Sequence, residues 1–564
     1  MNKLINLISL LIFVQINSQN INLNHDFIES DLRFHQIKGE LKTDYSFTLR
    51  PLNLNTLKEE NKSIEYLNSY SKKIFENNNK SISVQILPID YLIEYSSRHP
   101  YNRNNGSMIP NRGYQHLISG GIYAEIGPLT IQLNPEHHFS ENREFDGFWE
   151  GHYPVIWQER YSLWNSIDLP EKFGDDSHNQ LLIGQSSIRL NWKNFSLGIS
   201  NENIWWGPSI RNSIMMSNHA KGFKHITFNS IKPFKTKIGN FEWQVITGRL
   251  ESSGFTPPNI DFEYNGTKAY IPKINQMGVT NDWRYLQGFT ITYSPKLIKG
   301  MSLGFTRWVQ MYSMLVKGDM WWLEGNPSWF PAFKNLFRKN DIYENYEALT
   351  DQAAGIFLRW LWEDSKAEIY AEFHHNDSKQ NLRDLLLDSD HSRAATIGLQ
   401  KIFYINNTDY LFSWEWTQME QNASRLIRNA GSWYSHNKVR DGYTNNGEVL
   451  GSGIGPGSNS HYFSLKKINN NEKIGIALEV IDNDNDFYHL AFATARDYRR
   501  YWKDYNFHLN YSKKFENFWG SANFIYSRSL NYQWELDDTK SPYYHPGNDV
   551  NNFHLNFKLT YFFR

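Results

Sequence analysis

The sequence predicts an all-β membrane protein: a closed antiparallel outer-membrane β-barrel of about 18 strands with a small helical N-terminal periplasmic segment. Three observations predict this fold class. Short and long connections alternate between the candidate strands, apolar and polar residues alternate within the strands, and aromatic residues are abundant in a chain that is polar on average.

The composition is typical of a membrane barrel. The chain of 564 residues contains 20 Trp, 33 Tyr and 36 Phe, yet its mean hydropathy is −0.61. Barrel strands alternate lipid-facing apolar residues with polar residues that face the lumen, and aromatic girdles mark both membrane interfaces. A secreted, aromatic-rich carbohydrate-active protein would share this composition, so the composition alone leaves both classes open.

Period-2 alternation runs through a long series of candidate strands after about residue 80. The last of them places Phe553, Leu555, Phe557, Leu559 and Tyr561 on one face. Polar residues occupy the other face, at His554, Asn556, Lys558 and Thr560. One face of such a strand suits lipid and the other suits a wet lumen.

The connections alternate in length without exception. Short ones are expected at Gly127-Pro128, around Asn194, and at 232–239, 295–300, 363–366, 406–409, 469–472 and 514–517. Long ones are expected at 139–184, 204–222, 251–283, 313–352, 377–393, 421–460, 484–504 and 531–550. A barrel with tight periplasmic turns and long outside loops has this pattern, whereas a soluble β-sandwich or propeller gives no reason for it. A first strand at 82–97 makes the strand number even and places both termini in the periplasm.

The N-terminal region divides into two parts. Residues 1–19, with Lys3, the apolar run Leu4 to Val14 and a cut after Ser18 or Gln19, predict a secretory signal peptide. The alternative is a buried strand or a membrane anchor, but a spanning helix needs roughly 20 apolar residues. Residues 20–81 predict a periplasmic segment with an amphipathic helix at 56–77, and a second irregular or helical piece at 24–40. It either closes the pore as a plug or forms a soluble appendage, and 82–564 form the barrel.

Several kinds of chemistry are excluded or unsupported. The chain has no cysteine, which excludes disulfides, a lipoprotein anchor, thiolate metal sites and cysteine nucleophiles. The net charge of −1 does not recommend nucleic acid as a partner. The pairs His137-His138 and His374-His375 lie in strands, so their side chains point to opposite faces and cannot share a metal. The sequence predicts no catalytic residues, no metal and no cofactor, although it cannot show whether carboxylates such as Glu415 and Glu420 meet as a glycosidase pair.

Three stretches interrupt the strand pattern with Gly, Pro and Trp, at 99–113, 201–223 and 440–457. Sugars are bound by flat aromatic faces and by planar amide, guanidinium or carboxylate groups. The residues of these types are the predicted polysaccharide-binding residues Trp205, Trp206, Arg211, Asn218, Arg440 and Tyr443. The alternative for each is structural, because Gly-Pro turns with buried Trp are common where a loop folds into a barrel and packs.

These stretches resemble the Wzi-type capsule assembly family. The matching segments are Tyr95–Gly113 (YSSRHPYNRNNGSMIPNRG), Asn201–Phe223 (NENIWWGPSIRNSIMMSNHAKGF), Gly248–Ser253 (GRLESS) and Asp441–Gly457 (DGYTNNGEVLGSGIGPG). The resemblance covers most of the chain from about Gln85, and its Trp-Trp-Gly-Pro stretch is the most specific part. It implies an eighteen-stranded outer-membrane barrel with a helical periplasmic plug that binds capsular polysaccharide and helps to attach it to the cell surface.

The resulting hypothesis is a non-enzymatic barrel, integral to the outer membrane, whose long extracellular loops bind exported capsular polysaccharide. Its expected partners are that polysaccharide, outer-membrane lipid and the polysaccharide export machinery. The first alternative is a porin or transporter, which requires an open lumen. The second is a barrel enzyme that modifies polysaccharide.

Overall fold

The computed structural model describes residues 19–61, 64–275, 277–317, 330–333, 349–376, 382–469, 471–495, 497, 499–536 and 547–563. The predicted signal peptide, apart from Gln19, lies outside the described residues. Parts of the expected connections 313–352, 377–393 and 531–550 lie outside them as well.

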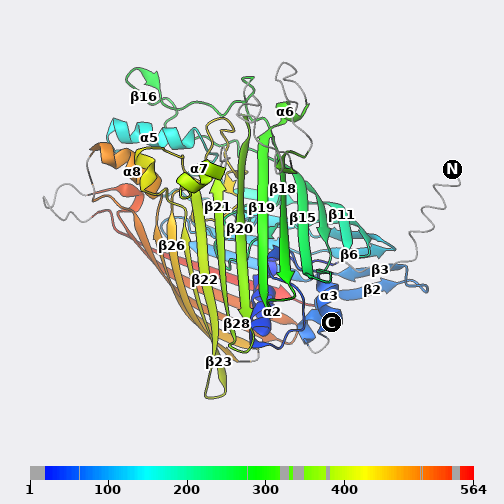
Figure 1. Ribbon diagram of the computed structural model, residues 1–564. Coiled ribbons are helices and arrows are strands. Elements are labelled where there is room, and N and C mark those ends of the chain that lie inside the picture. The colour runs from blue at the N-terminus through cyan, green and yellow to red at the C-terminus, as the bar shows by residue number, and fades with distance from the viewer. Residues whose placement is uncertain are drawn as a thin grey trace.

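Within this part of the chain, 24 strands form one large antiparallel sheet, which Figure 1 shows from the side. The strands are β2 (Lys72–Glu76), β3 (Ile82–Ile86), β4 (Ile89–Ser96), β5 (Gly113–Ser119), β6 (Ile122–Ile126), β7 (Leu129–Leu133), β8 (Glu136–Ser140), β9 (His178–Leu182), β10 (Ser187–Trp192), β11 (Phe195–Ser200), β13 (His225–Ser230), β14 (Phe234–Lys235), β15 (Gly239–Leu250), β18 (Arg284–Pro295), β19 (Met301–Tyr312), β20 (Asp351–Trp362), β21 (Ala367–Asn376), β22 (Arg393–Ile405), β23 (Thr408–Gln418), β26 (Asn459–Asn469), β27 (Glu472–Asp482), β28 (Lys503–Phe515), β29 (Phe518–Leu530) and β30 (Val550–Tyr561). The prediction of a mostly antiparallel β protein is confirmed.

The predicted alternation of connections is confirmed. Each short connection joins two strands that pair, from β6 and β7 at Gly127-Pro128 to β28 and β29 at 516–517. We call the edge of the sheet that carries these turns the turn end. The long connections leave the sheet at the opposite edge, the loop end, which is uppermost in Figure 1. They carry α5 (Pro154–Trp164), β16 (Glu263–Tyr264), β17 (Thr267–Lys268), α6 (Ser313–Lys317), η2 (Pro331–Phe333), α7 (Leu382–Leu387), η4 (Ala423–Leu426), β24 (Thr444–Asn445), β25 (Glu448–Val449), α8 (Asn485–Ala495) and η5 (Tyr532–Trp534).

The two faces of the sheet differ in polarity as the sequence predicts. In β22, Thr396 and Gln400 are buried on the inner face, while Ile397 between them is 42% exposed. In β30, Phe553 and Leu555 are exposed, whereas His554 and Asn552 are buried. This arrangement is the inverse of a water-soluble fold, in which apolar side chains point inward.

Four neighbouring strand paths are interrupted at one level. The interruptions are Pro88 between β3 and β4, Gly120–Gly121 between β5 and β6, Pro135 between β7 and β8, and Gly184 between β9 and β10. We call this line the crease. Backbone hydrogen bonds cross it, including Leu87 N–H to the Gly121 carbonyl at 2.9 Å. A Cβ at Gly121 would lie 1.8 Å from the Leu133 carbonyl oxygen, so this position requires glycine.

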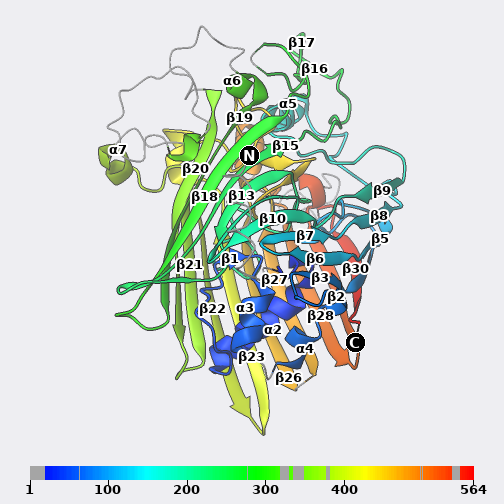
Figure 2. The same ribbon diagram turned by 90° about the vertical axis from the view of Figure 1, so that its right-hand side faces the viewer.

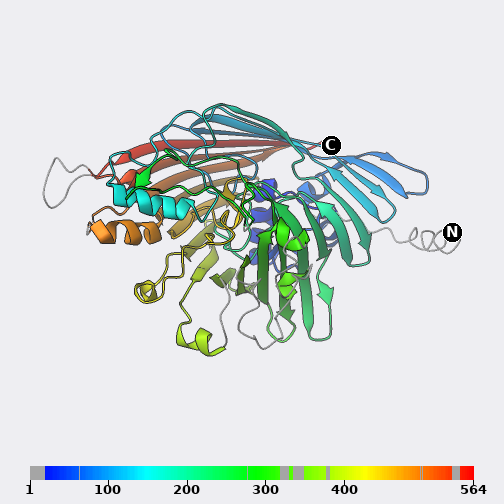
Figure 3. The same cartoon turned by 90° about the horizontal axis from the view of Figure 1, so that it is seen from above.

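The pairings at the two ends of the chain are also defined. The last strand, β30, pairs with β4 from Tyr561 opposite Ile89 to His554 opposite Ser96. Below the crease β3 pairs with β2 and β6, and above it β8 pairs with β5 and β9. The strands β2 and β9 therefore end the sheet. Seen from above in Figure 3, the sheet curves around the N-terminal helices.

The N-terminal segment folds as several short elements. The helical piece expected at 24–40 is confirmed as η1 (Leu23–His25) and α2 (Asp26–Lys38), and α2 ends at Gly39 with φ 82°. The single helix expected at 56–77 is wrong. That stretch forms α3 (Leu54–Glu60), α4 (Glu65–Asn68) and strand β2, which pairs with β3. Backbone pairing along the open edge of β3 outweighs the helical spacing of the apolar residues.

No helix among the described residues combines the length and the apolarity needed to cross a membrane.

Candidate functional site

The N-terminal residues 19–70 form an inner layer within the sheet near its turn end (Figure 2). Arg33 of α2 donates through Nε to Glu368 of β21 at 2.8 Å, and Glu368 also binds Arg359 of β20. All three side chains are buried. An isolated buried charge is energetically unfavourable. This triad therefore holds α2 against β20 and β21 only while its charges remain paired.

The inner layer is bound to the opposite side of the sheet as well. His25 lies 2.7 Å from Asp90 of β4, and Asn24 donates to Glu136 of β8 at 2.9 Å. Asp31 forms an ion pair with Lys473 of β27 at 2.5 Å. Burial by itself would raise the pKa of Asp31, but the charge of Lys473 and the hydrogen bond from His35 bring it below its usual range. Polar contacts thus bind this layer to strands on several sides of the sheet.

Residues 201–224 form a middle layer that crosses the interior. Three inward carboxylates, from β21, β23 and β27, hold it in place. Glu372 accepts from Ser209 N–H at 3.1 Å, and Glu415 accepts from the N–H groups of Ile210 and Asn212. Glu479 binds the Arg211 guanidinium through two oxygens, at 2.5 and 2.7 Å. The sequence leaves open whether carboxylates such as Glu415 and Glu420 meet as a glycosidase pair. In the structure both oxygens of Glu415 already accept hydrogen bonds from backbone N–H groups.

The Trp-Trp-Gly-Pro stretch belongs to this middle layer. Trp205 and Trp206 form β12 (Trp205–Trp206), which pairs with β1 (Leu49–Arg50) of the inner layer. Trp206 donates through Nε1 to Gln244 at 2.7 Å. Gly207 has φ 116°, and a Cβ there would lie 2.3 Å from the Glu372 carboxylate. The glycine of this motif is therefore required by backbone geometry and by the close approach of Glu372.

Residues 430–458 form an outer layer above the middle one. The Tyr443 ring stacks on Trp308 of β19 with a centroid distance of 3.9 Å and an interplanar angle of 3°. Its hydroxyl donates to the Met215 carbonyl at 2.8 Å, and the Tyr434 hydroxyl donates to the Ile214 carbonyl at 2.8 Å. The two layers therefore pack as one buried cluster.

An aromatic cap closes over these layers at the loop end, where α5 packs against α8. The Arg160 guanidinium of α5 lies over four rings, at 4.8 to 5.4 Å from their centroids: Phe148, Trp164, Phe487 and Trp534. Asp484 is 3.8 Å from this guanidinium. Burial lowers the pKa of Arg160, and the nearby carboxylates oppose that effect. Cation–π contacts of this kind favour a single packing of the two helices.

The six predicted polysaccharide-binding residues lie in two of these layers. Trp205, Trp206, Arg211 and Asn218 are in the middle layer, and Arg440 and Tyr443 are in the outer layer. Trp205, Trp206, Asn218 and Tyr443 are buried, and Arg211 is occupied by Glu479. Arg440 is partly exposed and donates to the carbonyls of Asn165, Ile271 and Pro272. The packing alternative accounts for the contacts of the buried residues, and their contact with a glycan stays a prediction.

Two exposed aromatic residues at the loop end were not singled out from the sequence. Tyr153, which precedes α5, is 61% exposed, and Tyr501 is 39% exposed. The Tyr501 ring stacks on Tyr488 at 3.8 Å. Glu420 lies close by and accepts from Asn459 and Asn485 at 2.7 and 2.9 Å. Nothing in the sequence separates these two from the chain's 33 tyrosines, because only the fold shows which rings remain uncovered.

The histidine and carboxylate side chains of the described ranges form no metal site. No group of three or more His, Asp or Glu side chains could hold a metal ion there. The predicted opposite orientation of His137 and His138 is confirmed, because His138 is buried beside Gln115 while His137 contacts Asn179 at the surface.

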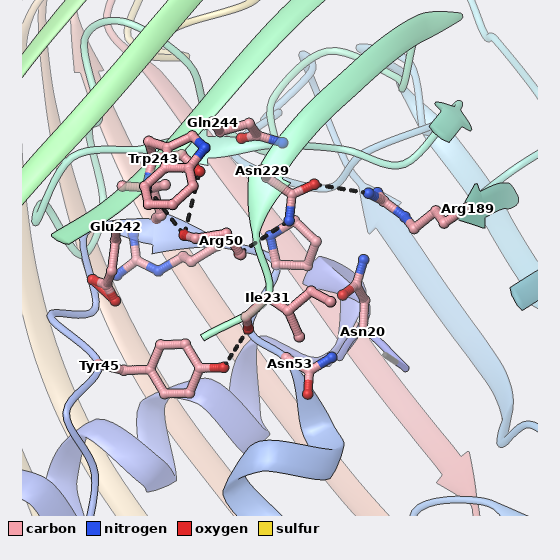
Figure 4. A pocket seen from close by; sticks show the side chains of 13 residues that line it. Asn20, Tyr45, Arg50, Asn53, Arg189, Asn229, Ile231, Glu242, Trp243 and Gln244 are labelled. Carbon is pink, nitrogen blue, oxygen red and sulfur yellow. Dashed lines mark hydrogen bonds between the residues drawn. The ribbon is translucent and has the colours of Figure 1, made fainter. Parts of the chain in front are cut away.

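One pocket, drawn in Figure 4, lies between the inner layer and the strands β13 and β15. Its lining includes Tyr45, Arg50, Asn53, Asn229 and Gln244. Its volume is about 40 Å³, which suits a few water molecules and not a sugar ring. Tyr45 already donates to the Ile231 carbonyl, and Asn229 accepts from Arg189.

Comparison with known proteins gives one family and several similar folds. The model of the family described as capsule assembly protein Wzi matches residues 101–519. The solved structure of Wzi, an outer membrane protein involved in group 1 capsule assembly in Escherichia coli and described as a carbohydrate-binding β-barrel, is 12% identical. The match covers 96% of this chain and 98% of that one, with a TM-score of 0.56.

Two further solved structures are less similar. OccAB2 of Acinetobacter baumannii is 10% identical over 85% of this chain and 98% of its own, with a TM-score of 0.38. OccK5 (OpdH) of Pseudomonas aeruginosa is 11% identical over 86% and 99%, with a TM-score of 0.36. No curated protein sequence matches the chain.

Proposed function

This chain belongs to the capsule assembly protein Wzi family, and from that membership we propose that it binds exported capsular polysaccharide and helps to assemble or attach it at the cell surface. The protein acts as an integral barrel of the outer membrane. It binds polysaccharide without catalysing a reaction. The observation that carries the proposal is the filled interior. Segments that could otherwise line a pore are packed into layers beneath the long loops.

The barrel closes with about eighteen strands. Support comes from counting each strand path that the crease interrupts as one strand: β3 with β4, β5 with β6, β7 with β8, and β9 with β10. On that count the antiparallel pairings run from the first path through β29 to β30, and β30 pairs back with β4. A closed ring satisfies the backbone groups that an open edge would expose to lipid.

The chain is divided into three parts. Residues 1–19 are a signal peptide, 20–81 are the periplasmic segment, and 82–564 are the barrel, with its tight turns in the periplasm and its long loops outside. The inner layer acts as a plug. Its contact with Asp90 of β4 and its ion pairs with β21 and β27 support that role over the alternative of a detached appendage.

The same layers favour a binding function over the function of a porin or of an enzyme. The three carboxylates of the middle layer, Glu372, Glu415 and Glu479, bind the protein's own backbone and Arg211. Side chains that are occupied in this way are poorly placed to line an ion path or to act on a substrate. Conductance across a planar bilayer comparable to that of an open porin would contradict this part of the proposal.

The glycan contacts lie on the loop-end surface. Arg440, of the six residues predicted from the sequence, contacts the polysaccharide together with Tyr153 and Tyr501. Trp205, Trp206, Arg211, Asn218 and Tyr443 shape that surface from below. Stacking on exposed tyrosines and hydrogen bonds from a guanidinium suit sugar rings and hydroxyls. A repeating polymer adds avidity, because neighbouring repeats raise the effective concentration at each site. The polysaccharide export machinery is an expected partner.

The test is retention of capsular polysaccharide on cells that carry Tyr153→Ala, Tyr501→Ala or Arg440→Ala in place of the parent protein. We expect each to lower retention, and purified protein to lose binding to immobilised capsule. Tyr404→Ala is the matched control, because Tyr404 is as exposed as Tyr153 but lies at the turn end. Unchanged retention in all three variants, at normal protein levels, would reject this surface as the contact.

A further inference from the structure

The same four-residue pattern occurs at both ends of the sheet. Lys296-Leu297-Ile298-Lys299 forms the turn between β18 and β19, and Arg425-Leu426-Ile427-Arg428 lies in the connection between β23 and β26. Leu297 and Ile298 are 98% and 41% exposed, and Leu426 and Ile427 are 86% and 95% exposed. The turn and the connection belong to opposite ends, so the two segments, which we call the inner tip and the outer tip, lie at opposite edges of the wall.

A pair of almost uncovered aliphatic side chains is unfavourable in water. The unfavourable free energy grows with the apolar area that stays in contact with water. Single exposed aliphatic residues are common, but two in succession between basic residues are typical of a segment that lies at a membrane interface. There the aliphatic groups enter the acyl region, while Lys and Arg reach the phosphate groups of the lipids.

The outer tip is continuous with the apolar outer face of the sheet. It begins seven residues after β23 ends at Gln418, and the outer faces of β23 and its neighbours carry Trp416, Phe463 and Ile397. Phe463 and Ile397 are exposed there. The neighbouring connection carries α7, whose Leu386 and Leu387 are also exposed, and Figure 2 shows α7 projecting sideways from the sheet. Aliphatic residues therefore extend the apolar face beyond the strand ends.

We propose that Leu426 and Ile427 insert into the outer-leaflet surface of the membrane, and that Arg425 and Arg428 lie against its phosphate groups. The inner tip does the same at the other leaflet with Leu297, Ile298 and Lys296. The ligand is thus an anionic, phosphate-bearing lipid surface. Branched aliphatic side chains lack the flat face that sugar stacking requires, so a lipid fits the outer tip better than a polysaccharide does. This inference rests on the proposed membrane barrel.

The absence of native cysteine allows a direct test in the full-length protein. The same substitution, Ile→Cys, is made at Ile427, at Ile397 on the outer face of β22, and at Ile260 in the connection between β15 and β18. Ile397 and Ile260 are similarly exposed, at 42% and 40%. Each variant is labelled with an environment-sensitive fluorophore and reconstituted into vesicles of zwitterionic lipid, or of zwitterionic lipid mixed with anionic phosphatidylglycerol. Quenching by brominated acyl chains and by aqueous iodide is then measured.

We expect the Ile427→Cys label to be quenched by brominated lipid at least about half as strongly as the Ile397→Cys label, because interfacial side chains lie ~5–10 Å into the headgroup boundary. The Ile260→Cys label should respond to iodide instead. Anionic lipid should increase the lipid quenching at Ile427, and Arg425→Gln with Arg428→Gln should abolish that increase.

Two results would overturn the inference, and they are distinguishable from failure of the barrel. If Ile397→Cys is quenched by lipid but Ile427→Cys only by iodide, the outer tip lies in water and the inference alone fails. If the Ile427→Cys label is shielded from both quenchers and sedimentation gives a dimer, a second copy of the chain covers the tip. If Ile397→Cys itself escapes lipid quenching, the membrane barrel is wrong.

Discussion

Arg33 of α2 donates to the Glu368 carboxylate of β21 at 2.8 Å, although 335 residues separate the two in the chain. Arg359 binds the other carboxylate oxygen, so one buried anion holds two buried cations. The attraction of such a group roughly offsets its desolvation, but removal of the shared partner leaves uncompensated charges inside the protein. The inner layer therefore depends on Glu368 more than on any of its exposed ion pairs.

The first prediction concerns this triad. Glu368→Gln should weaken the docking of the inner layer by about 3–5 kcal/mol, because it leaves Arg33 and Arg359 without their anion. Limited proteolysis of the folded protein measures this as faster cleavage within 20–70. Glu363→Gln is the control, because its pair with Lys299 is exposed to solvent and such surface pairs contribute little to stability. Equal cleavage rates in the two variants would show that the triad does not hold the layer.

The second prediction concerns the stacking of Tyr443 on Trp308. Tyr443→Ala should destabilise the outer layer by about 3–5 kcal/mol, because it removes a fully buried ring. Tyr443→Phe keeps the ring and loses the hydrogen bond to Met215, which should cost about 1 kcal/mol. Amide hydrogen exchange of 441–458 reports both values. Polysaccharide retention should fall with Tyr443→Ala and persist with Tyr443→Phe, and loss in both would favour direct contact through the hydroxyl.

The third prediction concerns the crease. Gly121→Ala places a methyl group 1.8 Å from the Leu133 carbonyl oxygen, so β6 and β7 must separate. We expect a marked loss of folded protein in the heat-modifiability assay on gels. Gly520→Ala adds the same methyl group in β29, where the nearest atom is the Leu559 side chain at 3.9 Å, and it should fold normally. Normal folding of both variants would mean that the crease tolerates a side chain.

The fourth prediction is a pH dependence in the aromatic cap. Burial, helped by the charge of Asp484, raises the pKa of Asp486 at the start of α8 to about 7. A carboxyl with a raised pKa stabilises the folded state below its unfolded pKa of about 4, and this contribution is lost as the pH rises to 7. The packing of α8 on α5 should therefore be weaker at pH 8 than at pH 5.

Asp486→Asn should reduce that dependence, because the amide mimics the protonated acid; the remaining part comes from Asp484, whose pKa burial raises to about 6. At pH 8 the free energy of local opening of α8 should be about 2–4 kcal/mol higher in the variant than in the parent. Hydrogen exchange of both proteins at each pH measures this difference. Asp261→Asn, at a fully exposed position, should leave α8 unchanged. A parent protein whose α8 protection is the same at pH 5 and pH 8 would contradict the assignment.

The strands and turns could be predicted from the sequence because their signals are local. A turn such as Asn406–Asp409 needs residues that accept tight backbone angles, and Asn406 and Asn407 both have positive φ. The interior layers could not be predicted in this way. Glu415 and Glu479 decide where 210–212 lie, and they stand more than 200 residues away in the chain. The helix expected at 56–77 failed for a different reason: its C-terminal part forms β2, which pairs with β3 only a few residues further along the chain, and this local pairing outweighs the helical spacing of the apolar residues.

The candidate site also has features that the sequence predicts and features that only the fold shows. The sequence identified the stretch around Trp205 and Trp206 by its composition, but only the fold shows that both rings face the interior. Tyr153 and Tyr501 have no sequence signal of their own, because their exposure depends on how α5 and α8 pack. Residue type therefore indicates the chemistry of a site, and the packing decides which of the suitable side chains are accessible.

The span between Arg33 and Glu368 also bears on the order in which the protein is built. The N-terminal segment leaves the ribosome first, yet its partners on β21 and β27 are made hundreds of residues later, and such long-range contacts form slowly. The N-terminal segment therefore lacks these partners until the sheet has formed around it. The pairing of β30 with β4 joins the last strand to one of the first. The β4–β30 pairing therefore cannot form until the whole chain has been made, so it comes late in assembly.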